Sequence, residues 1–526
     1  MRKETSLKNG IVAIFATVTN LLFAFFTQGI LVKYMGIEYQ GINGLFTNLV
    51  SMLAIVELGI GPAIVYNLYK PVAENDVNKI KSLMKFYKTS YTCIVSVITV
   101  IGLLLIPFLD AIVGETVVKN VTLLYILFLV DTIASYLLTY KRSILYANQK
   151  NYIVNIVHML YTIVLNVSQI LILIFTRNFV LFLIIKVVCR IIENVALSHI
   201  ASKLYSYINE KQVEPLDTEI KRDIFKKVKG LLFHKISTFV VNGTDNLLMS
   251  TFFGVSIVGM YTNYTTVITA ATTLIYHLFN SILGTIGNFL VTENKEKSYN
   301  IYLKLEFLNF WIYSLMAIGF FTCIQPFINI WMGDGYLFNT YIVFALAFNL
   351  FITGMRNNIN MFKNAAGIYH EDRYVPIIES LINIVASLLC IKLFGVIGII
   401  IGTTISSSVL FLYSYPKYVF NKLFDKSRWE YIKQTCKYFS IHLITLVIAM
   451  IITKLIRFDN NFVEIVKNIV IVITSVNIIY ICLFKKTEEY KYFKNIIANK
   501  LKIRSLIKRI SLIKEQYGKH NKKEAS

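Results

Sequence analysis

Long apolar segments alternate with short polar connections along almost the whole chain. A helix needs about 20 apolar residues to cross about 30 Å of hydrocarbon, because each residue adds about 1.5 Å. Fourteen segments approach that length, at residues 10–32, 43–66, 89–109, 119–140, 152–176, 178–200, 233–253, 257–290, 304–330, 337–360, 374–393, 395–415, 436–456 and 463–484. The pattern predicts an all-α integral membrane protein with about fourteen transmembrane helices.

Parts of this pattern occur twice. The segments Gly36 to Asn48 and Gly254 to Thr266 share two glycines and a threonine at a constant spacing of 218 residues. A weaker similarity relates residues 140–153 to residues 362–375 at a spacing of 222. Six predicted spans separate the copies, and an even number gives both the same orientation in the membrane. We therefore expect two six-helix lobes related by a parallel repeat, plus two extra helices.

The repeat also predicts a division into domains. The predicted parts are an N-lobe at 1–203 (spans 1–6), a cytoplasmic linker at 204–232, a C-lobe at 233–416 (spans 7–12), two further spans at 417–484 and a basic tail at 485–526. Within the tail, apolar residues such as Ile496, Ile497 and Leu501 recur at helical spacing among basic ones. This spacing favours an amphipathic cytoplasmic helix that lies on the membrane, although a solvated tail would obey the same charge pattern.

The formal net charge of +23 invites a nucleic-acid interpretation, which the placement of the charges argues against. Basic residues gather in the connections after spans 2, 6 and 12, whereas residues 110–118, 254–256 and 331–336 include no Lys or Arg. By the positive-inside rule, both termini of this multi-pass protein are expected in the cytoplasm. The basic loops and tail should then contact anionic membrane lipid and no nucleic acid.

The sequence gives no sign of an enzyme. Its six cysteines are scattered singly through the spans, and their spacing predicts neither a metal site nor a disulfide framework. There is no phosphate-binding glycine loop, no paired-carboxylate constellation and no long outer connection that could hold a sugar donor and acceptor. We therefore predict no catalytic residue, no metal and no cofactor.

Charged residues at membrane depth are the main functional candidates, because each costs roughly 2.5–3.5 kcal/mol on insertion scales. Lys186, Arg190 and Glu193 in span 6 share one helical face through their i, i+4 and i+7 spacing. Two interpretations stay open. The three residues are either a cationic strip that binds phosphate in a wet cavity or an Arg190–Glu193 pair that only joins helices.

Glu57 lies in the middle of span 2, beside Gly59, Gly61 and Pro62. Glycine and proline free backbone groups and permit a bend, which is typical of the broken helices that line transport sites. These four residues are candidates for a gate or an ion-coupling carboxylate. The alternative is a carboxylate that serves helix packing.

Other polar residues in the spans are single. The mid-span acids Asp131 and Asp245 are further gating or ion-coupling candidates. Arg356 is a cavity candidate, although it lies near a span end where its side chain could snorkel to the surface. His158 and His442 have no partners in the sequence pattern and are expected to be ordinary core polar groups.

Several blocks resemble one known family. The segments GIEYQGINGLFTNLVSMLAIVELGIGPAIVYNLYKP, TDNLLMSTFFGVSIVGMYTNY, DRYVPIIESLINIVASLL and GVIGIIIGTTIS are similar to Gram-positive polysaccharide flippases of the O-antigen (Wzx-like) type. That family belongs to the multidrug/oligosaccharidyl-lipid/polysaccharide exporter superfamily. The resemblance implies alternating access between two lobes in the bacterial plasma membrane. It implies an undecaprenyl-diphosphate-linked oligosaccharide as the substrate, moved to the outer leaflet for capsular or cell-surface polysaccharide biosynthesis.

The resemblance also maps onto single positions. The family's Glu-Leu-Gly-Ile-Gly block falls on Glu57 to Gly61, and its Thr-Asp-Asn block falls on Thr244 to Asn246. Gln28 stands where relatives often carry a span-1 arginine, which makes it a substrate-cavity candidate and a departure from the family. A polysaccharide polymerase and glycosyltransferases are conceivable partners. A multidrug exporter, a membrane glycan polymerase or transferase, and a flippase for the peptidoglycan precursor stay open as alternatives.

Overall fold

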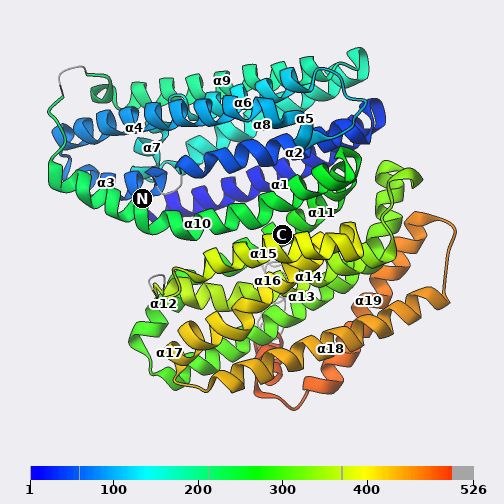
Figure 1. The fold of residues 1–526 in the computed structure, drawn as a ribbon. Coiled ribbons are helices and arrows are strands. Elements are labelled where there is room, and N and C mark those ends of the chain that lie inside the picture. The colour runs from blue at the N-terminus through cyan, green and yellow to red at the C-terminus, as the bar shows by residue number, and fades with distance from the viewer. Residues whose placement is uncertain (1, 58–59, 211–212, 369–370, 500–526) are drawn as a thin grey trace, which may run out of the picture. The chain divides into compact units, whose positions relative to one another are not determined.

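The computed structural model describes residues 2–57, 60–210, 213–368 and 371–499. Every regular element in this part of the chain is helical, as Figure 1 shows. Eleven helices among the described residues are long and apolar enough to cross a membrane. The predicted all-α membrane architecture is confirmed.

The helices follow the predicted spans in order. The first seven spans correspond to α1 (Arg2–Met35), α2 (Ile37–Leu53) with α3 (Ile60–Glu74), α4 (Val77–Leu104) with α5 (Leu109–Val113), α6 (Val121–Tyr136) with α7 (Arg142–Ala147), α8 (Asn151–Thr176), α9 (Phe179–Leu204) and α10 (Thr218–Phe253). The last seven correspond to α11 (Val255–Ser281) with α12 (Leu283–Thr292), α13 (Lys295–Met332), α14 (Thr340–Ala365), α15 (Val375–Phe394), α16 (Val396–Val409) with α17 (Asn421–Phe424), α18 (Arg428–Leu455) and α19 (Asn461–Phe484). A π-helix, Leu410–Phe420, joins α16 to α17.

The described chain forms two compact units. The first comprises Met1–Thr273, Ile324–Asn349 and His370–Leu410, and the second comprises Leu274–Cys323, Leu350–Tyr369 and Phe411–Ser526. The lobe boundaries drawn from the sequence repeat divide the chain differently and stay predictions. Helix α10 begins at Thr218, so the second half of the predicted linker is helical. Residues 488–499 are also helical, whereas the rest of the proposed tail helix lies outside the described residues.

Side chains at helix starts explain several element boundaries. Asp76, Asn178, Asp217, Ser427 and Asn460 each accept a hydrogen bond from a backbone N–H in the first turn of the following helix. Such caps satisfy backbone donors that have no partner within the helix. Short polar connections therefore suffice to end one apolar helix and begin the next.

The two copies of the sequence repeat contact each other in the structure. Gly36 before α2 and Gly254 before α11 both adopt left-handed backbone conformations, with φ of 96° and 82°. A Cβ added at Gly41 would overlap the carbonyl oxygen of Val255, and one added at Gly259 would overlap that of Ile37. Since Val255 and Gly259 lie 218 residues beyond Ile37 and Gly41, the two contacts are equivalent. Helices α2 and α11 thus pack as copies related by a local twofold axis.

In the second unit, rings pack α18 and α19 against α13. The Phe310 ring stacks on Tyr438 at 4.4 Å and on Tyr480 at 4.9 Å between ring centroids. His442 stacks on Phe351 of α14 at 3.7 Å. Aromatic pairs contribute roughly 0.5–1.5 kcal/mol beyond the burial of their surface. The last two helices are therefore integral parts of this unit.

Replacing Gly41 with Ala should destabilise the protein, because the new methyl group has no room beside Val255. Overpacking of this kind costs about 1–3 kcal/mol. A thermal melt of the detergent-solubilised protein would measure the change. Gly319→Ala in α13 is the control, since nothing lies within 4 Å of its added Cβ. Equal melting temperatures for the two variants would contradict the close packing of α2 on α11.

Candidate functional site

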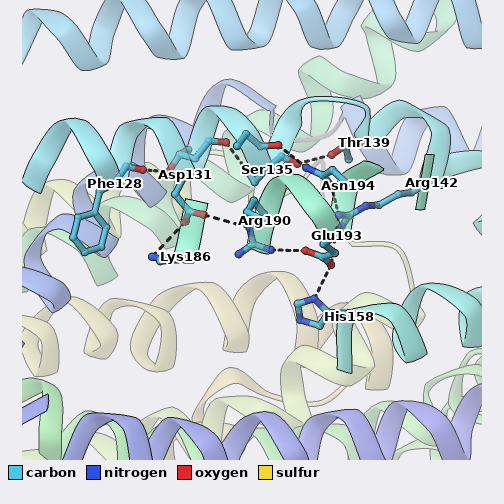
Figure 2. A network of polar contacts seen from close by, with 12 residues as sticks. Phe128, Asp131, Ser135, Thr139, Arg142, His158, Lys186, Arg190, Glu193 and Asn194 are labelled. Atoms are coloured by element: carbon cyan, nitrogen blue, oxygen red, sulfur yellow. Dashed lines mark hydrogen bonds and ion pairs between the residues drawn. The ribbon is translucent and has the colours of Figure 1, made fainter. Parts of the chain in front are cut away.

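A broken helix positions the main polar cluster of the first unit. Helix α6 ends at Tyr136, Leu137 is extended, and Leu138 has a φ of 63°. A left-handed backbone costs a residue with a side chain roughly 1–2 kcal/mol. The 3-10 turn Thr139–Lys141 follows and leads into α7. Arg142, the first residue of α7 after this break, extends toward Glu193 and Asn194 of α9 (Figure 2).

Glu193 of α9 is the hub of the cluster. Its side chain is completely buried, and its Oε2 atom lies 2.9 Å from Nη1 of Arg190, one turn earlier. The other oxygen, Oε1, lies 2.9 Å from Nδ1 of His158 in α8 and 3.5 Å from Nη2 of Arg142 in α7. One carboxylate therefore joins three helices (Figure 2).

Asp131 of α6 extends the cluster along α9. Its carboxylate oxygens lie 3.3 Å from Nζ of Lys186 and 3.5 Å from Nε of Arg190. The Lys186 ammonium also lies 4.6 Å from the centroid of the Phe128 ring, and the Arg190 guanidinium lies 4.5 Å from that of Tyr161. Ring faces stabilise cations in such positions, so each base is held by both an acid and a ring.

The break in α6 has its own hydrogen-bonding partner. Asn194, next to the hub, donates from Nδ2 to the carbonyl oxygen of Ala134, and its Oδ1 accepts from Arg142. Backbone groups that a broken helix frees at membrane depth must find partners within the protein. Asn194 therefore ties the broken end of α6 to α9.

The network has more basic than acidic groups. Three cations, Lys186, Arg190 and Arg142, contact two carboxylates, those of Asp131 and Glu193. The side chains of Lys186 and Arg190 are 21% and 20% exposed, whereas that of Glu193 is 0% exposed. The acids are therefore the better covered partners in the network.

The structure brings together only part of what the sequence suggested. Lys186, Arg190 and Glu193 do lie together, and Asp131 joins them. Arg142 was missed as a member. His158, expected to be an ordinary core polar group, contacts Glu193 and so also belongs to the cluster, which its isolated position in the sequence did not indicate. A physical argument could have indicated such partners, because a carboxylate buried in the membrane requires cationic or hydrogen-bonding groups from neighbouring helices.

Glu57 lies at the interruption between α2 and α3, where Ala54–Glu57 form a 3-10 turn. Its Oε1 atom accepts a hydrogen bond from the Tyr91 hydroxyl at 3.1 Å, and Tyr91 stacks on Tyr136 of α6 at 6.4 Å. A Cβ on Gly61 would lie 3.0 Å from the Glu57 carboxylate. Pro62 lies in the first turn of α3, and Gly59 is outside the described residues.

Asp245 belongs to a separate cluster between α10, α15 and α16. Its two carboxylate oxygens lie 3.4 and 3.2 Å from the Thr403 hydroxyl. Asn383 donates to that hydroxyl at 3.1 Å and accepts from Thr244 at 3.3 Å. Among the described side chains, the polar contacts of Asp245 are with this hydroxyl, and no cation pairs with its carboxylate. Such an environment suits a proton or a small cation.

The two remaining candidates lie in other contacts. Gln28 of α1 is buried, donates to Asn263 at 2.6 Å and accepts from the Thr266 hydroxyl at 2.9 Å, both in α11. It therefore joins α1 to α11 as a neutral group. Arg356 belongs to the second unit, where its Nε donates to the Tyr415 hydroxyl at 3.2 Å.

Comparison with known proteins identifies solved structures with a similar fold. No protein-family model matches the chain, and no curated protein does either. The lipid II flippase MurJ, in an inward closed conformation, matches with a TM-score of 0.63 and 16% identity over 91% of this chain and 98% of MurJ. An inward-facing multidrug resistance MATE transporter of the MOP superfamily matches with a TM-score of 0.60 and 17% identity, over 77% and 96% of the two chains.

A mutant of the Vibrio cholerae MATE transporter VcmN matches with a TM-score of 0.55 and 12% identity, over 83% and 98% of the two chains. At such identities the likeness establishes the fold alone. The chain is a multi-pass membrane protein with the fold that MurJ and the MATE transporters share.

Replacing Glu193 with Gln should destabilise the protein strongly, because Arg190 and Arg142 would lose their shared carboxylate. Removal of one partner from a buried ion pair costs about 3–5 kcal/mol. Thermal melts in detergent would test this against Glu296→Gln, which alters an exposed acid in the first turn of α13. A Glu193→Gln protein as stable as this control would contradict the role of Glu193 as the hub.

Proposed function

We propose that this protein carries an anionic lipid-linked oligosaccharide across the bacterial plasma membrane, from the cytoplasmic to the outer leaflet. The observation that carries this proposal is the excess of partly exposed cations at membrane depth in the Glu193 network. A diphosphate presents several acceptor oxygens to such groups and can form charge-assisted hydrogen bonds with Lys and Arg. An undecaprenyl-diphosphate-linked oligosaccharide combines this anionic group with a sugar part and a lipid part.

The network's geometry favours transient binding. Lys186 and Arg190 already contact Asp131, so an arriving phosphate would compete with a resident carboxylate. When the phosphate leaves, Asp131 recovers both partners and no cation stays uncompensated. This exchange limits the affinity, which a carrier needs in order to release its substrate.

Physical conditions in the membrane also favour this function. A sugar cannot shed its water into hydrocarbon, because each unpaired polar group costs several kcal/mol. Transport through a protein path avoids that cost while the polyprenyl chain stays in lipid. An inside-negative potential adds about 2.3 kcal/mol per charge per 100 mV in favour of outward movement of an anion.

A second candidate is a lipid-linked peptidoglycan precursor. The likeness to MurJ, named as a lipid II flippase, extends over 91% of this chain and favours it. Both candidates are lipid-linked and anionic. A multidrug exporter is less well supported, because the network has an excess of bases and the MATE structure covers a smaller share of the chain.

Depletion of the protein should leave lipid-linked oligosaccharide in the cytoplasmic leaflet and remove the surface glycan. Leaflet-specific labelling of extracted lipid-linked glycans would measure this. Wild-type protein should restore transport, and Lys186→Gln should restore it about tenfold less well, because the network then loses its excess cation. Lys203→Gln, at an exposed position on the same helix, should behave as wild type.

The lipid that accumulates decides between the candidates. Accumulated peptidoglycan precursor would favour the second one. If the repeat units still reach the outer leaflet but are not polymerised, the protein acts after flipping. If neither lipid pool changes, the proposal is wrong and export of small molecules becomes the better explanation.

Asp245 is our candidate for ion coupling, because its carboxylate is buried among uncharged oxygen and amide groups. Asp245→Asn should abolish any dependence of transport on a Na⁺ or proton gradient while leaving the protein folded. Transport into vesicles with imposed gradients would measure it. A variant that keeps the gradient dependence of the wild type would exclude Asp245 from coupling.

A further inference from the structure

A pocket in the second unit is lined by residues that belong to neither of the clusters described above. Its cavity volume is about 310 Å³, and its walls come from the start of α13, the first turns of α18 and the residues at the end of α19. Pockets of roughly 300 Å³ and more commonly hold small ligands or parts of larger ones. The pocket therefore offers enough space for a phospholipid head group.

Four charged side chains line this pocket, two of each sign. Lys433 and Lys437 lie one turn apart on α18, Glu430 precedes them on the same helix, and Glu489 follows α19. No ion pair joins any two of these four in the described structure. The Glu430 carboxylate instead accepts a hydrogen bond from the Tyr299 hydroxyl at 2.6 Å. Both signs of charge are therefore available to a ligand.

The pocket has an aromatic side as well. Tyr438 and Phe484 line it, and the Lys437 ammonium lies 5.5 Å from the centroid of the Phe484 ring. Aromatic residues of this kind suit a site where one end is apolar and the other polar. The lining thus combines charged groups with apolar surface in one cavity.

The position of the pocket relates it to the membrane surface. Helix α18 begins at Arg428 and α19 ends at Phe484, and both are apolar enough to span a membrane. The pocket lies at these two ends, which the positive-inside rule assigns to the cytoplasmic leaflet. Toward the middle of the same helices, Ile444 and Ile478 are 59% and 62% exposed. Acyl chains attached to a head group in the pocket would meet apolar side chains there.

We propose that this pocket binds the head group of phosphatidylethanolamine. Its phosphate would lie at Lys433 and Lys437, and its primary ammonium would donate to Glu430 and Glu489. An anionic head group without an amine, such as that of phosphatidylglycerol, would leave both carboxylates uncompensated. The site is independent of the transported substrate, so it stands or falls separately from the proposed function.

Native mass spectrometry of the full-length detergent-solubilised protein tests this proposal, with phosphatidylethanolamine and phosphatidylglycerol added at equal concentration. The wild-type protein should retain more phosphatidylethanolamine. Glu489→Gln should lower that preference about fivefold, because it removes one acceptor for the ammonium and one repulsive charge against phosphatidylglycerol. Lys437→Gln should weaken binding of both lipids, because both carry a phosphate.

Adjacent residues provide matched controls. Glu488 precedes Glu489 but pairs with Lys491 at 2.8 Å and does not line the pocket, so Glu488→Gln should leave lipid preference unchanged. Lys454→Gln removes a cation from the other end of α18 and should also have no effect. Equal retention of the two lipids by the wild-type protein would overturn the proposal. So would Glu488→Gln and Glu489→Gln variants with the same lipid preference.

Discussion

The cost of burying the Glu193 carboxylate organises the first unit. An isolated carboxylate in hydrocarbon costs far more than any single contact returns, so Glu193 must have partners. Those partners come from α7, α8 and α9 itself, and Asp131 of α6 shares one of them. The ion pairs and hydrogen bonds that compensate this charge therefore connect four helices, α6, α7, α8 and α9.

The same ion pairs serve both the packing of the helices and the proposed transport. Lys186 and Arg190 hold helices together when paired with Asp131, and the same two groups are the most accessible cations of the network. The alternatives of a cationic strip and a structural pair are therefore compatible. Under the proposed transport, an anion that displaced Asp131 from Lys186 and Arg190 would loosen this arrangement of helices, which would couple binding to conformation.

The fold was largely predictable from the sequence, because each transmembrane helix is recorded locally as a run of apolar residues. The repeat was predictable because Gly36 and Gly41 recur as Gly254 and Gly259. The partners of Glu193 could not be predicted from the sequence, because they depend on which helices become neighbours in the fold. The break after Tyr136 was hidden as well, because no glycine or proline marks the left-handed Leu138.

The contact between α2 and α11 has an evolutionary consequence. In a dimer of identical chains, a residue on the twofold axis faces its own copy, and the two must be the same. Here a Cβ on Gly44 would lie 2.5 Å from the hydroxyl of Thr262, its counterpart 218 positions later. One copy carries glycine at this position, and the threonine of the other copy fills the space that the missing side chain leaves. A dimer of identical chains could not carry that complementary pair on its axis, whereas two copies within one chain can differ at this position.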